Sequence, residues 1–191
     1  SGWITTGPRV KLLERRLAAY IETGDTTIDC DTDEAKARYS NKVVCLNSAT
    51  AAEELNFRVC GIGEGDEVIV PAYTYTATAS AAIHCGAKVV FIDSQKDSTE
   101  MDYEKVAEAI TERTKAIVAV DIAGIIADYD KLYEIVEAKK DLFVAKDDNS
   151  LGSKIQKVLG RVLVFADSAH GLGAVKNGKM SGEIADFTSF S

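Results

Sequence analysis

The stretch Val162-Leu163-Val164-Phe165-Ala166-Asp167-Ser168-Ala169-His170 says most about the fold and the chemistry of this chain. Its first five residues are apolar and rich in β-branched and aromatic types, which predicts a strand buried on both faces. The stretch then presents a carboxylate, two small residues and an imidazole at the carboxyl end of that strand. In open α/β sheets, ligands bind at this end of the strands. Because an unpaired buried carboxylate is costly to desolvate, we expect a cationic partner for it.

Composition narrows the class of protein. The chain has 191 residues, 46% of them hydrophobic, and a net charge of −8. This size allows a sizeable core, and the acidic balance argues against a nucleic-acid or membrane partner. We find no apolar run near the roughly 20 residues that span a bilayer, and no charged-then-apolar leader, so we expect a cytoplasmic protein. The cysteines are widely spaced and form no C-x-x-C pair, which predicts reduced, mostly buried thiols and no metal site: Cys30, Cys45, Cys60 and Cys85.

Strand and helix patterns alternate along the chain, which predicts an α/β fold with a mainly parallel sheet. We expect strands at residues 43–46, 67–70, 88–92, 116–120, 162–166 and 187–190. We expect helices at 8–24, 50–60, 76–85, 102–110 and 129–139, a short helical piece within 25–41, and a hairpin within 171–182. The polar segment 146–160 lacks clear periodicity until Ser153 and is expected to be a surface insertion.

Three turns at the ends of the predicted strands carry polar or aromatic groups. Residues 47–51 (Asn-Ser-Ala-Thr-Ala) lead into a helix whose first amides are unpaired, and Thr50 adds a hydroxyl. Such a turn suits a phosphate, although an ordinary helix cap by Ser48 explains it equally well. Residues 71–77 place Tyr73 and Tyr75 at a second turn, where a flat heterocycle would stack on an aromatic ring. The alternative for both tyrosines is packing in the core or at a subunit interface.

The third turn holds Asp167 and His170. A carboxylate that accepts a hydrogen bond from a ring N–H⁺ keeps that nitrogen protonated. His170 is suited to a ring substituent, although a lone histidine is more often structural. A phosphate cradle, an aromatic platform and a carboxylate together fit a phosphorylated pyridinium, and pyridoxal 5′-phosphate is the cofactor that matches.

Two other patterns are less informative. The glycine-rich stretch 61–65 follows a predicted helix and precedes a strand, the reverse of the order that a dinucleotide-binding loop needs. Four acidic residues lie in polar loop or at a helix start, where solvated or capping acids are common, and we expect no metal there: Asp128, Asp130, Asp147 and Asp148.

The residues carry a family resemblance. The segments 1–8, 47–52, 61–74 and 167–171 resemble the nucleotide-sugar aminotransferases of the DegT/DnrJ type. The resemblance implies a three-layer α/β/α large domain with the aspartate-aminotransferase-like fold and a mainly parallel mixed sheet. It also implies pyridoxal 5′-phosphate, a homodimer with active sites at the subunit interface, and amino-sugar or polysaccharide biosynthesis. The implied reaction moves an amino group from an amino acid, usually glutamate, to a keto-sugar nucleotide.

The resemblance also assigns roles by position. Asp167 is implied to pair with the pyridine nitrogen and His170 to contact the ring hydroxyl, so these two residues are the expected catalytic residues. Tyr75 falls at the ring-stacking position. The implied phosphate-binding residues are Ala49, Thr50, Ala51 and Ser191. Thr6 and Gly7 lie in the segment that usually lines the sugar-nucleotide site.

The chain departs from the family pattern in two places. Asp121-Ile122-Ala123-Gly124 stands where the family often has His, Tyr and Gly, so sugar specificity does not carry over. The lysine that holds the cofactor usually follows a few residues after the position of Ser191, and none of Lys146, Lys154, Lys176 and Lys179 matches its place. We expect these four to be solvated charges. We therefore expect residues 1–191 to be an incomplete large domain, truncated at both ends and without the C-terminal small domain.

Two alternative functions stay open. Some relatives carry a histidine in place of the lysine and dehydrate sugars instead of aminating them. A third possibility is a non-catalytic relative, against which the presence of Asp167, Tyr75 and Thr50 argues.

Overall fold

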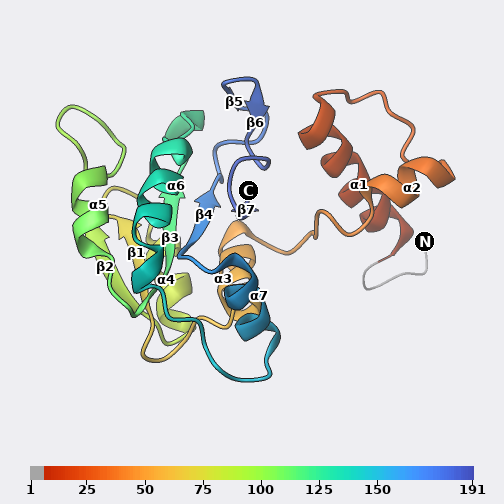
Figure 1. Ribbon diagram of the computed structural model, residues 1–191. Helices are drawn as coiled ribbons and strands as arrows, with labels where there is room; N and C mark the ends of the chain where they lie inside the picture. The colour runs from red at the N-terminus through yellow and green to blue at the C-terminus, as the bar shows by residue number, and fades with distance from the viewer. Residues whose placement is uncertain (1–6) are drawn as a thin grey trace.

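A parallel sheet forms the centre of this computed structural model, which describes residues 7–191 (Figure 1). Its five strands lie in the order β2-β1-β3-β4-β7. All of their pairings are parallel. The strands are β1 (Glu67–Pro71), β2 (Lys88–Ile92), β3 (Thr114–Val120), β4 (Leu163–Asp167) and β7 (Phe187–Ser189). The expected hairpin is confirmed as the antiparallel pair β5 (Val175–Lys176) and β6 (Lys179–Met180).

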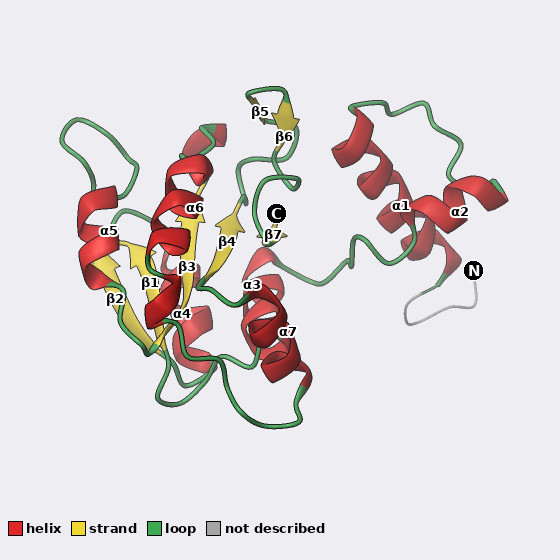
Figure 2. Ribbon diagram, in the orientation of Figure 1, coloured by secondary structure: helices red, strands yellow, loops and turns green. Residues whose placement is uncertain are grey.

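Helices cover both faces of the sheet (Figure 2). One face packs against α3 (Ala49–Val59), α4 (Thr76–His84) and α7 (Leu151–Leu159), and the other against α5 (Tyr103–Ala109) and α6 (Tyr129–Ala138). In β4, Leu163 and Phe165 belong to the first cluster, whereas Val164 and Ala166 belong to the second. This alternation is the two-residue period of a strand buried on both sides. The predicted three-layer α/β/α class is confirmed.

Two further helices precede the sheet, α1 (Pro8–Thr23) and α2 (Asp33–Tyr39). They share a small apolar cluster and lie to one side of the sheet in Figure 2. Pro8 occupies the first turn of α1, and Gly24 closes the helix in the left-handed conformation, with φ of 71°. The expected helix at 8–24 is therefore confirmed, and α2 is the short helical piece expected within 25–41.

The strand expected at 43–46 was a wrong prediction. These residues belong to no strand, and Val44 and Leu46 are exposed. A β-branched run forms a strand only where a partner strand is available for its amides and carbonyls. Here the run links α2 to α3 outside the sheet (Figure 2).

The segment 146–160 also differs from its expected form, since it contains α7. Gly152, Ser153 and Gln156 of this helix are buried. The Gln156 side chain donates to the Cys60 carbonyl at 2.8 Å and accepts from the Lys146 amide at 2.9 Å. Leu151, Ile155, Val158 and Leu159 recur at helical spacing, so the sequence does carry a helical period. Leu151 and Val158 are nevertheless exposed, and the fully buried positions of α7 are small or polar.

The strand order reverses between β1 and β3. This reversal indicates where a ligand would bind, at the sheet edge formed by the carboxyl ends of the strands. The chain runs from β1 outward to β2 and then crosses to β3 on the other side of β1. The intervening helices α4 and α5 lie on opposite faces of the sheet. A crevice forms at the carboxyl ends of the strands where the order reverses. The turns after β1, β3 and β4 therefore meet at one edge of the sheet.

Residues 7–191 include all four cysteines and all the helices described above. Within this range the four cysteines are free thiols, and Cys30 and Cys60 are buried. No cluster of three or more metal-ligating side chains occurs among these residues. None of the helices described is both long enough and apolar enough to cross a bilayer.

Candidate active site

Asp167 is the last residue of β4, and its carboxylate is buried, with 5% of the residue exposed. Oδ2 accepts a 2.7 Å hydrogen bond from the hydroxyl of Thr78 on α4. Oδ1 accepts from the amide of Ala169 at 3.2 Å, which closes the turn after the strand. The carboxylate is thus held by two parts of the fold, helix α4 after β1 and the turn after β4.

No lysine, arginine or histidine pairs with Asp167 among residues 7–191. Hydrogen bonds from one hydroxyl and one amide leave part of the acceptor capacity of the carboxylate unused. A buried anion in this state is stabilised by a cation brought by a ligand. The site therefore fits the protonated nitrogen of a pyridine ring.

The beginning of α3 supplies donors for an anion. Ser48 caps the helix, and its hydroxyl accepts from the Ala51 amide at 3.1 Å. The cap suggested by the sequence is confirmed, and it occupies only the third amide of the helix. The amides of Ala49 and Thr50 have no acceptor within their own helix, because they precede its first backbone bond. A helix start with free amides favours a phosphate.

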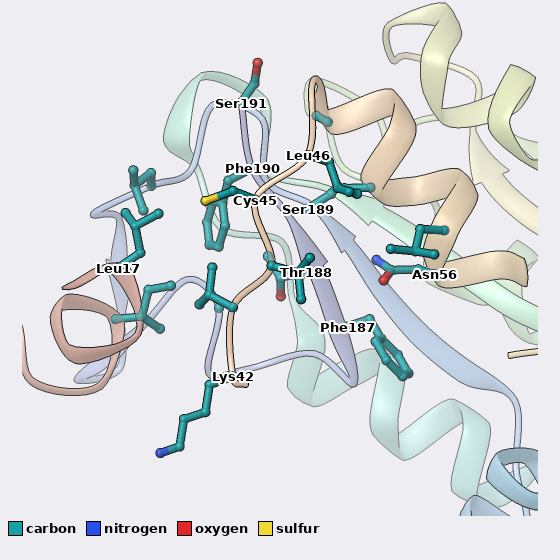
Figure 3. Close-up of a pocket in the computed structure, with 18 of the residues that line it drawn as sticks. Leu17, Lys42, Cys45, Leu46, Asn56, Phe187, Thr188, Ser189, Phe190 and Ser191 are labelled. Carbon is teal, nitrogen blue, oxygen red and sulfur yellow. The ribbon is translucent and has the colours of Figure 1, made fainter. Parts of the chain in front are cut away.

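A cavity of about 680 Å³ adjoins this helix start (Figure 3). Ser48, Ala49 and Ser191 line it together, although Ser191 is distant from the other two in the sequence. Leu17 and Phe190 form part of its apolar wall, from α1 and from the segment after β7 (Figure 3). Among residues 7–191, six predicted site residues are absent from the lining: Gly7, Thr50, Ala51, Tyr75, Asp167 and His170.

Tyr75 precedes α4 as its N-cap residue and is 77% exposed. Tyr73 is also exposed, at 58%. Packing of either ring in the core of this chain is therefore ruled out. Both rings remain free to stack on a flat ligand or to meet another subunit.

His170 lies in the turn after β4 and is exposed. Its Nδ1 accepts from the Ala123 amide at 3.3 Å. In the neutral ring this bond leaves the hydrogen on Nε2, so the imidazole can donate to a ligand oxygen. Of the two expected sugar-binding residues, Thr6 lies outside the described residues, and Gly7 caps the start of α1.

The Asp121 segment, where the chain departs from the family pattern, has a structural role that sequence reasoning missed. The Asp121 carboxylate is buried and accepts four hydrogen bonds, from the hydroxyls of Tyr129, Ser168 and Ser181 and from the Ala127 amide. Burial and the charge of Asp121 raise the pKa of Tyr129. Asp121 thus anchors the turn that carries Asp167 and does not point toward a ligand.

Two of the lysines expected to be solvated are also structural. Lys146 pairs with Asp66 at 2.9 Å and donates to the Gly61 carbonyl at 2.5 Å. Lys176 donates to the carbonyls of Ile126 and Ala127. Neither lysine approaches Asp167 closely enough to form an ion pair.

Sequence reasoning also missed Thr78 and Glu53. Thr78 is fully buried in α4, a helix rich in small residues, and no local pattern marks it as a hydrogen-bond donor to Asp167. Glu53 had a detectable signal, because it stands four residues before Phe57 and seven before Cys60, on the buried face of α3. An acidic residue at a buried position of a helix that begins beside the proposed site is a candidate functional residue.

Comparison with known proteins agrees with this geometry. A sequence profile of the DegT/DnrJ/EryC1/StrS aminotransferase family matches residues 1–161. The chain is 32% identical to the spore coat polysaccharide biosynthesis protein SpsC of Bacillus subtilis, over 100% of the chain and 39% of SpsC. It is 36% identical to the GDP-perosamine synthase of Caulobacter vibrioides, over 78% of the chain and 34% of that enzyme.

A solved structure gives the same result. The PLP form of the putative sugar aminotransferase Spr1654 from Streptococcus pneumoniae superposes with a TM-score of 0.85 at 49% identity, over 100% of this chain and 43% of that one. The chain thus spans about two fifths of the length of the relatives it matches, which agrees with the expectation of a longer protein. It belongs to the DegT/DnrJ/EryC1/StrS aminotransferase family, whose enzymes depend on pyridoxal 5′-phosphate.

Proposed function

We propose that this protein takes part in moving an amino group from an amino acid, glutamate in the first instance, to a keto-sugar nucleotide. The reaction would serve amino-sugar or polysaccharide biosynthesis. The observation that carries the proposal is Asp167, a buried carboxylate at the carboxyl end of β4 that has two neutral donors and no cation among the described residues. Family membership supports the same chemistry.

The residues present fit pyridoxal 5′-phosphate. Asp167 would accept a hydrogen bond from the ring nitrogen and favour its protonated form. The free amides of Ala49 and Thr50, the Ala51 turn and the Ser191 hydroxyl would hold the phosphate. Tyr75 would stack on the ring, and the Nε2 hydrogen of His170 would be donated to the ring hydroxyl oxygen.

Each of these residues would contribute to the reaction through binding and charge. When bound, the cofactor supplies an electron-accepting ring and a carbon that carries the amino group between substrates. Asp167 would hold a proton on the ring nitrogen, where negative charge from the substrate is received. Thr78 and the Ala169 amide hold the Asp167 carboxylate in place. The α3 amides would hold the phosphate at the opposite end and so help to orient the ring.

Partners and location complete the proposal. Tyr73 and Tyr75 leave aromatic surface exposed beside the proposed site, which supports a homodimer with its active sites at the interface. Thr6 and Gly7 are proposed to face the sugar nucleotide. The net charge of −8 supports small-molecule substrates and no nucleic-acid or membrane partner, and we infer a cytoplasmic enzyme.

The test uses the full-length gene product. Loaded with pyridoxal 5′-phosphate, it is expected to show a visible absorption band, and glutamate is expected to convert the cofactor to its amine form with release of 2-oxoglutarate. A keto-sugar nucleotide should then restore the original band and yield an amino sugar. Loss of water from the sugar without net amination would support the dehydratase alternative. A colourless protein indifferent to the cofactor would contradict the proposal and favour a non-catalytic relative.

A further inference from the structure

Glu53 is a buried acid that the proposed mechanism leaves unused. It lies on the second turn of α3, and 5% of the residue is exposed. Oε1 receives one long hydrogen bond, 3.4 Å from the hydroxyl of Ser189. Oε2 is buried and has no hydrogen-bond partner among the described residues. A buried carboxyl oxygen without a partner is costly, so its protonation state and neighbour need an explanation.

That neighbour is Asp167. Ser189, which contacts Glu53, stands directly opposite Asp167 in the parallel pair of β4 and β7. Glu53 therefore lies beside the end of β4, next to the strand position that Asp167 occupies, and the charge of Asp167 acts on its carboxyl group. The groups that β7 and α4 turn toward this pair are neutral hydroxyls, those of Ser189 and Thr78. Asp167 is the titratable group whose charge acts on Glu53 within residues 7–191.

Two adjoining buried carboxyl groups cannot both be ionised without a cation. Burial, together with the charge of Asp167, raises the pKa of Glu53 to about 9. The hydrogen bonds also indicate that Glu53 carries the proton. Asp167 receives two donors at 2.7 and 3.2 Å, whereas Glu53 receives one at 3.4 Å. The shared proton therefore belongs to Glu53.

We propose that Glu53 is a positioning residue whose neutral carboxyl group donates a hydrogen bond from Oε2 to the Asp167 carboxylate. This bond satisfies the Oε2 oxygen that otherwise lacks a partner. It also draws negative charge away from the Asp167 oxygens that face the ring nitrogen. This second effect rests on the proposed function, because it requires the pyridine ring of the cofactor beside Asp167.

This hydrogen bond would weaken the interaction between Asp167 and the protonated ring nitrogen. A carboxylate that already accepts a strong hydrogen bond is a weaker base. Glu53 would thus hold the ring nitrogen less firmly protonated than Asp167 alone would. Removing the donor in E53L should raise the pH at which the ring nitrogen loses its proton. The amide of E53Q also donates, so this variant should largely restore the original behaviour.

The first measurement needs no cofactor. Infrared spectra of the full-length apoprotein at pH 7 should contain the carbonyl stretch of a neutral carboxylic acid that is lost in E53Q. The matched control is E14Q. Glu14 is equally buried, at 5%, but its oxygens accept from Lys11 Nζ at 2.8 Å and from the Cys45 amide at 3.0 Å. The band should remain in E14Q. Absence of the band from the wild-type protein, or its survival in E53Q, would overturn the proposal.

The second measurement uses the full-length protein loaded with cofactor labelled with ¹⁵N at the ring nitrogen. The ¹⁵N shift, followed against pH, should show deprotonation about one pH unit higher in E53L, a tenfold change in acidity, and close to wild type in E53Q. An unchanged titration in E53L would refute the effect on the ring. If the protein binds no cofactor, the proposed function fails, yet the infrared result still decides whether Glu53 donates to Asp167.

Discussion

Thr78 Oγ1 donates a 2.7 Å hydrogen bond to Asp167 Oδ2 and so joins the helix after β1 to the end of β4. The hydroxyl of Thr74 lies 2.8 Å from that of Thr78 and extends the chain of bonds to the turn after β1. Because Thr78 donates to the carboxylate, Thr74 donates to Thr78. The carboxylate is thereby tied to the same turn that carries Tyr75.

Replacing Thr78 by valine tests this bond. T78V keeps the volume but removes a donor to a buried carboxylate, so the free energy of unfolding should fall by about 1–3 kcal/mol. Cofactor binding should weaken as well, because Asp167 is less firmly held. Urea unfolding and cofactor titration of the full-length protein measure both effects. T74V, which removes a donor only to another hydroxyl, should cost less, and equal losses in the two variants would argue against a direct role of Thr78.

Replacing Asp167 by asparagine tests the proposed cofactor partner. D167N removes the charge that keeps the ring nitrogen protonated, so amino transfer should fall about a hundredfold or more, while the fold persists. Rates of 2-oxoglutarate release and circular dichroism spectra of the full-length protein report the two properties. Turnover comparable to that of the wild type would refute the role.

Tyr75 tests the stacking platform. Because 77% of the residue is exposed, Y75A should leave unfolding almost unchanged. Loss of stacking should weaken cofactor binding by about 1 kcal/mol, roughly a fivefold rise in Kd. Y73A is the matched control, since Tyr73 is also exposed but is not the expected stacking residue. If Y73A weakened binding more than Y75A, the platform would have to be reassigned.

Glu53 predicts a distinctive dependence of stability on pH. Its pKa rises from 4.5 to about 9 on folding, because of burial and the charge of Asp167. Between these values the folded protein holds a proton that the unfolded chain has released. The contribution of Glu53 to the free energy of unfolding therefore falls as the pH rises, by up to about 1.4 kcal/mol per pH unit.

Urea unfolding of the full-length apoprotein between pH 5 and 9 checks this sign. E53Q has no such proton, so its stability relative to the wild type should grow with pH. Burial alone would raise the pKa of Glu14, but the hydrogen bonds from Lys11 and from the Cys45 amide lower it overall. The E14Q difference should therefore not grow over this range. A flat difference for E53Q would mean that Glu53 is already ionised.

Gly152 tests the packing of α7 on α3. A Cβ at this position would collide with the backbone of Gly61, so G152A should destabilise the protein by about 1–3 kcal/mol. L151A changes the neighbouring residue, which is 62% exposed, and should shift stability by no more than about 0.5 kcal/mol. Thermal or urea unfolding of both variants distinguishes an integral helix from a surface insertion, which would tolerate either change.

Local patterns predicted many elements closely. The strand expected at 88–92 matches β2 residue for residue, and Gly24 ends α1 as expected. Both follow from neighbours in the chain, an apolar run in one case and a left-handed glycine in the other. The run at 43–46 failed for the opposite reason, since a strand also needs a partner that lies elsewhere in the chain. In α7 the helical period was present in Leu151, Ile155 and Leu159, but the fully buried positions are small or polar, so burial could not be read from the apolar residues.

The sequence by itself determined the alternation of strands and helices, the burial of β4 on both faces, and the position of Asp167 at the end of that strand. These depend on the spacing of side chains along the backbone, which folding does not change. Only the tertiary structure decided which groups surround Asp167. Thr78, 89 residues away in the chain, reaches it through the strand order, and Glu53 through the packing of α3 on β7. Such contacts depend on how distant elements pack, so the charge of Asp167 acquires its neighbours only when the sheet forms.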